Sequence, residues 1–339
     1  MSVYIHCGLR SPIGALNGQY KHMRPEMLGA KVIDALINRH SISQVDGLFC
    51  GNAVGTGGNI GRLMGLMCNL PNSVPAITVD MQCASALMSI EMAYTHIASG
   101  VMDAVIAGGI ESSSLQPERV YALGDDRKGT YKVAQFTPQD QSPLVMLEGA
   151  ERTIYKHNVT KEDLYPHIIG SHQRASAALD NPYLQSYIMP ITIDGKRCID
   201  ECIRPTMNEK LLSRMKPLLG ADSITNAGNA CLTHDGAAFV YLSNKKGPFK
   251  IHSVKPWAGN PQFSPEGALE STEGILKRTG LTMDDIDVVE WNEAFAIIDV
   301  LFNKAYPNHI KKYNMLGGAL AYGHPYGCSG AILVLHCMA

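Results

Sequence analysis

The amino-acid sequence predicts an α/β fold made of two repeated halves, and three observations carry this prediction. Short runs rich in β-forming residues alternate with segments whose apolar residues recur at helical spacing. A long polar, turn-rich stretch interrupts that alternation in the middle of the chain. Small residues beside a cysteine open an apolar helix in each half. With 339 residues, the chain is also long enough to bury more than one hydrophobic core.

The composition is that of a soluble globular protein. Hydrophobic residues make up 45% of the chain and charged residues 18%, and 29 Lys and Arg nearly balance 31 Asp and Glu. This balance argues against nucleic acid or an anionic membrane as a partner. No run approaches the ~18 apolar residues of a membrane helix, and the N-terminus has no basic stretch followed by an apolar core. We therefore expect a cytoplasmic protein.

The nine cysteines are an odd number, which does not suit a framework of disulfides. Cys198 and Cys202 lie four residues apart, but no second cysteine pair or histidine pair follows at the spacing of a zinc site. The sequence therefore predicts reduced thiols and no bound metal.

The first half shows the alternation clearly. Residues 45–55, "VDGLFCGNAVG", indicate a strand that runs into a glycine-rich turn, and residues 76–82, "AITVDMQ", indicate a second strand. Residues 84–100 have helical spacing and end at Gly100, which is a typical stop signal. Residues 102–114, "MDAVIAGGIESSS", then indicate a buried strand that ends in glycines and serines.

The polar stretch is predicted to be an insertion into this core. It contains two helical segments, and regular structure returns at "TNAGNACLTHDGAAFVYLSN", followed by predicted strands at "FKIHSVKPWA" and "IDVVEWNEAF". The predicted organisation is a first part of the N-terminal half, an inserted loop region, a return to the N-terminal half and a C-terminal half. These parts span residues 1–111, 112–225, 226–248 and 249–339.

A weak internal repeat links the two halves. Residues 83–86 lie opposite residues 328–331 when the halves are aligned, and each set opens an apolar helix. The repeat predicts a further strand after "AILVLHCMA" to match "DAVIAGGIES", because a sheet without it would leave an unpaired edge.

Cys83 is the first candidate for chemistry. It follows a strand directly and precedes a helix, so the chain must turn sharply there and place the thiol near the helix N-terminus. Free N–H groups at that end favour the thiolate, which is the nucleophilic form. The alternative is a buried cysteine that only packs against the next strand.

Asn292 and His324 are two further candidates. Asn292 follows an apolar strand at the edge where open α/β sheets build their sites, although it could also be a turn former or a helix cap. His324 lies between Gly323 and Pro325, in a turn that gives the backbone freedom on one side and fixes it on the other. Its alternative is an ordinary loop residue.

Taken together, these segments resemble the motif set of the thiolases, in order and over almost the whole chain. The resemblance is carried by "MQCASALMSI", "GGIES", "NAGNACLTHDGAA", "NEAFA" and "GGALAYGHPYGCSGA". It implies a thiolase-like five-layered αβαβα arrangement of two repeated halves with an inserted loop domain. It also implies coenzyme A thioesters as substrates, no separate cofactor, and a homodimer or homotetramer.

The resemblance implies a role for each candidate. Cys83 would carry the acyl group, His324 would act as base and later as donor to an oxyanion, and Asn292 would position a water as the second donor. Met146, Cys231 and Gly318 would contact the coenzyme A portion of the substrate. Two departures weaken that binding set: Val145 precedes Met146 where the family has histidine, and Cys231 replaces the common serine.

Carbon–carbon bond formation in thiolases also uses a second cysteine, in a C-terminal "CxGGGxG"-like segment. The sequence stops at Ala339 before such a segment, and we expect a shortened chain rather than a natural end. Cys328 opens a helix and Cys337 is predicted on its apolar face, so neither is expected to be the base.

Two functions therefore stay open. The leading one is acetyl or acyl transfer between coenzyme A thioesters, as acetoacetyl-CoA formation or 3-ketoacyl-CoA cleavage. The alternative is a thiolase-like acyl-CoA-binding or scaffold protein without condensation activity. A related ketoacyl or hydroxymethylglutaryl synthase is disfavoured because "NEAFA" with "GGALAYGHP" resembles thiolase usage more closely.

Overall fold

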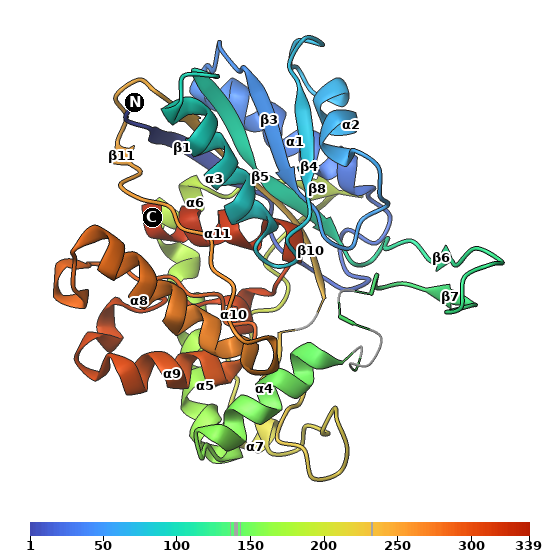
Figure 1. Cartoon of the computed structure of the whole chain (residues 1–339), viewed down its shortest axis with the longest axis vertical. Coiled ribbons are helices and arrows are strands. Elements are labelled where there is room, and N and C mark those ends of the chain that lie inside the picture. Colours follow the sequence, from blue (N-terminus) through green and yellow to red (C-terminus); the bar gives the residue numbers. More distant parts are fainter. Residues whose placement is uncertain (136, 139–141, 143, 232) are drawn as a thin grey trace.

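The protein is described by a computed structural model that covers residues 1–135, 137–138, 142, 144–231 and 233–339. One seven-stranded mixed sheet lies in the upper part of the molecule in Figure 1, in the order β11-β1-β10-β5-β3-β4, with β2 beside β10. Its strands are β1 (Tyr4–Arg10), β2 (Gly14–Ala15), β3 (Gly47–Gly51), β4 (Ala76–Val79), β5 (Ala104–Ser112), β10 (His234–Ser243) and β11 (Phe249–Lys250).

The middle of this sheet is fully buried. All nine residues of β5 are buried, and the strand pairs in parallel with β3 on one side and antiparallel with β10 on the other. Since β3 also runs parallel to β4, the C-terminal ends of β3, β4 and β5 lie at one edge of the sheet. The α/β class and the first-half strands predicted from the sequence are confirmed.

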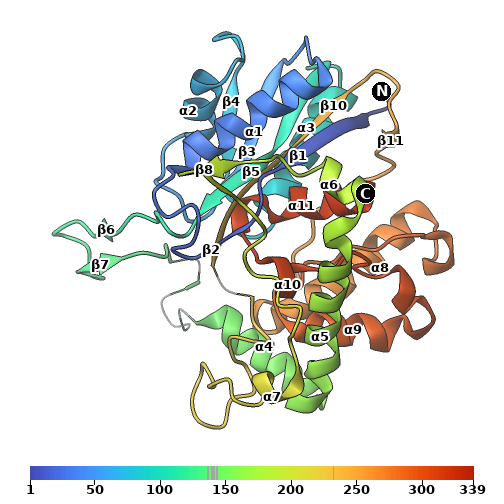
Figure 2. The same ribbon diagram turned by 180° about the vertical axis from the view of Figure 1, so that it is seen from behind.

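Helices cover both faces of the sheet, as Figures 1 and 2 show from opposite sides. Helices α1 (Pro25–His40) and α2 (Ile60–Met67) pack on one face through residues such as Val32, Leu36 and Met64. Helices α3 (Ser85–Ala98) and α11 (Tyr326–Met338) pack on the other, where Ile90 and Leu335 share one core. The helices that the sequence repeat pairs therefore lie against each other in one layer.

The inserted region adds helices and two small hairpins. The hairpin β6–β7 projects from the body of the molecule (Figure 1). Asp200 anchors the end of the region to the sheet, because it accepts two 2.8 Å hydrogen bonds from the buried guanidinium of Arg10. Its elements are β6 (Arg119–Val120), β7 (Thr130–Tyr131), α4 (Val145–Lys156), α5 (Lys161–Ala177), α6 (Pro182–Ser186), β8 (Thr192–Ile193), β9 (Lys196–Arg197) and α7 (Glu209–Leu212).

The second half is helical in the described part of the chain, and here the strand predictions were largely wrong. Of the strand expected over 249–258 only Phe249–Lys250 forms, and 286–295 is extended with single bridges at Val289 and Phe295. These segments have strand character, but no neighbouring strand among the described residues extends the bridges into a ladder. The helices are α8 (Gly267–Thr279), α9 (Ala296–Ala305), α10 (Ala319–Tyr322) and α11.

Helical length and polarity also bear on membrane insertion. Among the described residues, no helix is both long and apolar enough to span a bilayer. The cytoplasmic location stays a prediction from the sequence.

A buried carboxylate joins the two halves where α11 meets the sheet. Glu111, at the end of β5, accepts hydrogen bonds from the backbone N–H of Ala53 (3.0 Å) and of Gly327 in α11 (3.0 Å). The Asn52 amide (2.9 Å) and the Val54 N–H (3.2 Å) complete its set of donors. One side chain therefore fixes the loop after β3 and the first turn of α11 against β5.

We predict that Glu111→Gln lowers the free energy of unfolding by about 2–4 kcal/mol, because the amide brings an N–H₂ group among backbone donors and leaves some of them unpaired. Burial raises the pKa of Glu111 from 4.5 to about 7. The stability contributed by its protonation is thus fully present below about pH 4.5 and is lost as the pH rises through 7. Denaturant unfolding should show a larger penalty at pH 5 than at pH 8, whereas the exposed Glu118→Gln should show neither effect.

Candidate active site

Cys83 lies in a tight turn between β4 and α3, at the C-terminal edge of the parallel strands. The preceding residue, Gln82, has a φ of 49°, which is a left-handed backbone conformation that residues other than glycine seldom adopt. Ser85 holds this turn, since its hydroxyl accepts from the Met81 N–H (2.8 Å) and donates to the Gln82 carbonyl (2.6 Å). The sharp turn predicted at Cys83 is therefore confirmed.

The expected thiolate at Cys83 is not what the surroundings favour. The side chain keeps some access to solvent, yet burial of the sulfur, assisted by the negative charge of Glu111, raises the pKa of the thiol to about 12. Desolvation outweighs the helix N-terminus here, because Cys83 lies one residue before the helix cap rather than within the first turn. Cys83 is a thiol at neutral pH, so its nucleophilic form requires a base.

His324 has the form of such a base. Its Nδ1 lies 2.6 Å from the Ser329 hydroxyl, which itself donates to the Pro325 carbonyl (2.9 Å). Because the single Ser329 hydrogen is used there, Nδ1 must carry the ring proton and donate to the Ser329 oxygen. Nε2 is then the unprotonated nitrogen, and it accepts from the Asn292 amide at 3.2 Å. The hydrogen-bond network thus assigns the tautomer with a free base at Nε2.

The histidine is also held uncharged. Burial and the neighbouring His234 lower the pKa of His324 to about 3, so the ring is neutral at pH 7. His234 Nδ1 accepts the backbone N–H of His324 (3.0 Å), which fixes the position of the turn. Gly323 has a φ of 108°, and an added Cβ would meet the His234 ring at 2.5 Å, so only glycine suits this position.

Asn292 is positioned through its neighbour Glu293. The buried Glu293 carboxylate accepts from the Ser171 hydroxyl (2.6 Å), the Asn314 amide (3.0 Å) and the Leu320 N–H (3.2 Å). These partners come from α5, from the segment before α10 and from α10 itself. A carboxylate with several donors rigidifies the turn that presents Asn292 to His324.

The three residues predicted to contact coenzyme A have different surroundings. Met146 lies in the first turn of α4, and its side chain is 38% exposed. Cys231 is half-buried beside α10, where its thiol donates to the Ala319 carbonyl at 2.9 Å. At Gly318 an added Cβ would lie 2.3 Å from the Glu293 carboxyl carbon, so its smallness serves packing on Glu293. Contact of these three with coenzyme A stays a prediction.

Tyr326 marks where the site residues converge. Its ring lies 4.8 Å from that of His324, and the pKa of its hydroxyl is raised by burial and then by the charges of Cys83 and Cys231. The structure therefore brings Cys83, His324 and Cys231 near one ring, and Asn292 joins them through its contact with His324. In the described part of the chain no group of three His, Cys, Asp or Glu residues could hold a metal ion.

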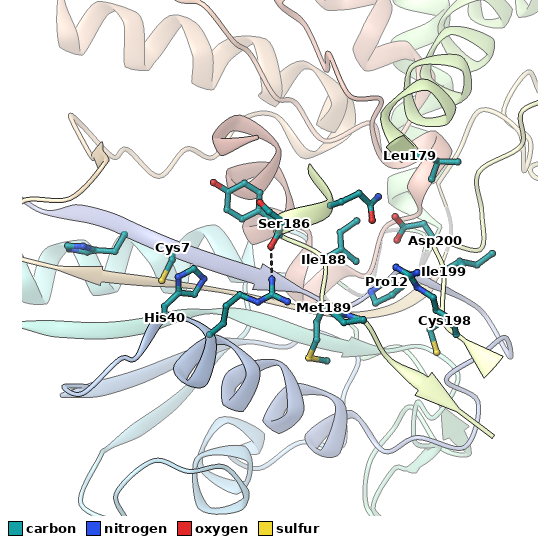
Figure 3. Close-up of a pocket in the computed structure, with 16 residues that line it drawn as sticks. Cys7, Pro12, His40, Leu179, Ser186, Ile188, Met189, Cys198, Ile199 and Asp200 are labelled. Atoms are coloured by element: carbon teal, nitrogen blue, oxygen red, sulfur yellow. Dashed lines mark hydrogen bonds between the residues drawn. The ribbon is translucent and has the colours of Figure 1, made fainter. Parts of the chain in front are cut away.

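A wide pocket of about 830 Å³ lies elsewhere (Figure 3). It is lined by residues of β1, the end of α1 and the inserted region, including Cys7, Met189 and Cys198. It contains none of the six predicted site residues, so volume alone does not locate the chemistry.

Sequence reasoning missed two residues of this site, Ser329 and Tyr326. Both lie in the same "GHPYGCSG" segment as His324, and the signal for Ser329 is its place near the start of the helix that follows the histidine. The expectation that Cys337 faces the apolar side of its helix was wrong, because its side chain is exposed.

Comparison with known proteins identifies the family of this chain. The family model for the thiolase N-terminal domain matches residues 3–246, and that for the thiolase C-terminal domain matches residues 249–339. This chain belongs to the thiolase family. Two proteins named "Putative acetyl-CoA C-acetyltransferase VraB", from Staphylococcus epidermidis and Staphylococcus aureus strain MW2, are each 32% identical to it. The alignments cover 96% of this chain and 88% and 89% of those proteins.

Solved structures show the same likeness. The Bacillus anthracis acetyl-CoA acetyltransferase superposes with a TM-score of 0.89 at 26% identity, covering 99% of this chain and 91% of that one. Human mitochondrial 3-ketoacyl-CoA thiolase in complex with CoA superposes with a TM-score of 0.91 at 28% identity, covering 99% and 90%. These neighbours confirm the predicted thiolase fold.

We predict that Ser329→Ala slows modification of Cys83 by N-ethylmaleimide at pH 7 by roughly 10²-fold, because His324 loses the partner that keeps Nε2 unprotonated. Ser329→Thr keeps the acceptor oxygen and should restore most of the rate. Ser89→Ala, which removes a buried serine of α3 bonded to Gly108, is the matched control and should leave the rate unchanged. An unchanged rate in Ser329→Ala, with peptide mapping of the labelled cysteine, would contradict the assigned tautomer.

Proposed function

We propose that this protein transfers acetyl or acyl groups between coenzyme A thioesters through an acyl-cysteine on Cys83. The observation that carries the proposal is the His324 network: a neutral imidazole with an unprotonated Nε2, which shares the neighbour Tyr326 with a cysteine that cannot ionise unaided. Its reaction would be acetoacetyl-CoA formation or 3-ketoacyl-CoA cleavage.

The first step follows from these protonation states. His324 Nε2 takes the proton of the Cys83 thiol as the sulfur attacks the thioester carbonyl carbon, and the carbonyl π electrons move onto oxygen. When the tetrahedral intermediate collapses, the bond to the coenzyme A sulfur breaks, and that sulfur leaves with a proton from His324. One thioester replaces another, so a sulfur nucleophile suits the exchange energetically.

The negative oxygen of the intermediate needs donors. Protonated His324 can supply one, and Asn292 can hold a water as the second, as the family resemblance implies. Losing one such donor typically costs ~10² to 10³ in rate. The tight set of bonds around Glu293 supports this role, because a donor is effective only when it is already oriented.

Coenzyme A is proposed as the carrier of the acyl group. The support is that the relatives are named for acetyl-CoA chemistry and that one structural neighbour was solved with CoA. Met146, exposed at the start of α4, and Cys231, beside the site, are the proposed contacts of this chain. Cys231 can offer only a weak S–H donor where serine would offer a hydroxyl.

The carbon–carbon bond step separates the proposal from its alternative, an acyl-CoA-binding or scaffold protein. That step needs a second base, and the cysteines of α11 are poorly suited to it. Cys328 is fully buried against the sheet, where burial raises its thiol pKa well above the ordinary value, and Cys337 is exposed near the end of α11. Acyl loading without cleavage or condensation would favour the alternative.

Protein produced from its complete reading frame should become acetylated on Cys83 when mixed with acetyl-CoA, and should cleave acetoacetyl-CoA when coenzyme A is added. Peptide mass spectrometry locates the acetyl group and ultraviolet absorbance follows the cleavage. Cys83→Ala should abolish both, whereas Cys337→Ala removes an exposed thiol and should alter neither. A wild-type protein that never acetylates Cys83 would refute the proposal.

We further propose that two copies associate through the open edge of β4, giving the homodimer expected from the family resemblance. Strand β4 is an edge strand of the sheet, and the unpaired backbone N–H and C=O groups of an edge strand can pair with a strand of another chain. Ile77 on this strand is 40% exposed, and neighbouring α2 and α3 add further exposed apolar side chains. They are Leu63, Leu66, Met67 and Leu87.

Ile77→Lys should therefore shift the protein from dimer to monomer, because it places two like charges against each other at the shared edge. Light scattering coupled to size-exclusion chromatography measures the mass directly. Val101→Lys, at an exposed position between α3 and β5, is the control and should leave the mass unchanged. A wild-type protein that is monomeric at micromolar concentration contradicts the proposed association.

A further inference from the structure

A buried carboxylate and a buried imidazole face each other behind Asn292. The side chains of Glu290 and His336 are each 2% exposed, and Oε2 lies 3.8 Å from Nδ1, too far for a hydrogen bond. None of the two carboxylate oxygens or two ring nitrogens has a hydrogen-bond partner within the described residues. Leaving such groups unpaired destabilises a folded protein, so this pair is unfavourable as a purely structural element.

Among the residues that the structure describes, the surroundings offer this pair no other partner. The titratable groups around it come from every neighbouring element: Arg174 (α5), Glu293, Tyr313, Tyr322 (α10) and Cys337 (α11). Arg174 is directed at Glu293 (3.6 Å), the Tyr322 hydroxyl donates to the Leu316 carbonyl, and the Tyr313 hydroxyl donates to Asp299. His336 is therefore the group best placed to balance a charge on Glu290.

A small cavity connects the pair to the active site. Its volume is about 10 Å³, close to the space that one water molecule requires. His336, Ser329 and Asn292 all line it. Ser329 is the residue that accepts the Nδ1 proton of His324. A water in this cavity would therefore lie between Ser329, which contacts His324, and His336, which faces Glu290.

We propose that Glu290 and His336 form a buried proton acceptor that takes the proton of Cys83 by way of His324, Ser329 and one water in this cavity. The inference rests on the proposed function of Cys83 as the nucleophile. Glu290 and His336 do not touch the substrate, so they are positioning residues that act through His324.

The transfer balances as follows. The Cys83 S–H bond breaks and a bond from that hydrogen to His324 Nε2 forms, while the Nδ1 proton passes to the Ser329 oxygen. Ser329 turns its own hydrogen from the Pro325 carbonyl into the cavity and gives it to the water, which gives one to the His336 ring. Cys83 ends as a thiolate, His324 is neutral again, and the new imidazolium of His336 lies beside the Glu290 carboxylate. The reverse path returns the proton.

This route solves an electrostatic difficulty at the site. A protonated His324 would be a buried cation next to His234, in a place that lowers the pKa of its ring to about 3. Moving the charge to His336 places it beside a buried carboxylate instead. A purely structural pair would affect unfolding but would not affect how readily Cys83 ionises.

The test follows alkylation of Cys83 by iodoacetamide between pH 6 and 10 in wild type, Glu290→Gln and His336→Gln. Because this range lies below the thiol pKa, each variant should slow alkylation about tenfold at every pH in it. The control is His157→Gln, which removes another histidine paired with a glutamate, 2.8 Å from Glu266 at the far end of α4, and should leave the profile unchanged. Unchanged profiles in two folded variants would overturn the proposal.

A second measurement needs no variant. The alkylation rate of the wild-type protein in mixtures of H₂O and D₂O should curve downward with deuterium content, because several protons move together, and a straight line would also overturn the relay. Acetylation of Cys83 by acetyl-CoA is measured on the same samples. If Cys83 is acetylated but the alkylation profiles of the variants are unchanged, only the relay is refuted. If those profiles shift but Cys83 is not acetylated, only the proposed function is refuted.

Discussion

The buried carboxylate of Glu111 is the interaction on which the site depends. It accepts hydrogen bonds from backbone donors of the loop after β3 and of the first turn of α11, and both must be in place for the segments of the candidate site to meet. Cys83 follows the strand next to β3, and His324 directly precedes α11. Glu111 therefore links the proposed nucleophile of one half to the proposed base of the other. Its own negative charge adds to the desolvation that keeps Cys83 protonated.

The site combines a thiol that is hard to deprotonate with an imidazole that is hard to protonate. Burial raises the pKa of Cys83 to about 12 and lowers that of His324 to about 3, so neither group is charged at rest. If Cys83 and His324 were an ion pair at rest, their attraction would stabilise the protein before substrate binds and would not lower the barrier. A neutral pair develops charge only as the sulfur attacks, so its attraction stabilises the transition state. The same burial makes a positive charge on His324 unfavourable once it has formed. The polar groups of Ser329, His336 and Glu290 matter because they could take that charge away.

The sequence was sufficient for the alternation of the first half, for the turn at Cys83 and for Asn292 and His324 as candidates, because each has a local pattern. It was not sufficient for the second-half strands, since "IDVVEWNEAF" has strand composition but forms single bridges in the described chain. The charge state of Cys83 was also out of reach, because desolvation depends on residues distant in sequence. Ser329 was missed because a serine in a helix has no signal of its own until the histidine it contacts is placed.

The inserted region and the second half provide different parts of the site. From the insertion, α5 contributes Ser171 to the bonds around Glu293, and Asp200 fixes the region to β1 through Arg10. From the second half, the turn at Asn292 and helix α11 contribute the polar groups of Ser329, His336 and Glu290. Because Glu290 and Asn292 are two residues apart on one extended segment, the residue that faces His324 and the residue that balances the relayed charge cannot move independently. The geometry of the proposed oxyanion donor and that of the proposed proton acceptor are therefore set by the same short stretch of chain.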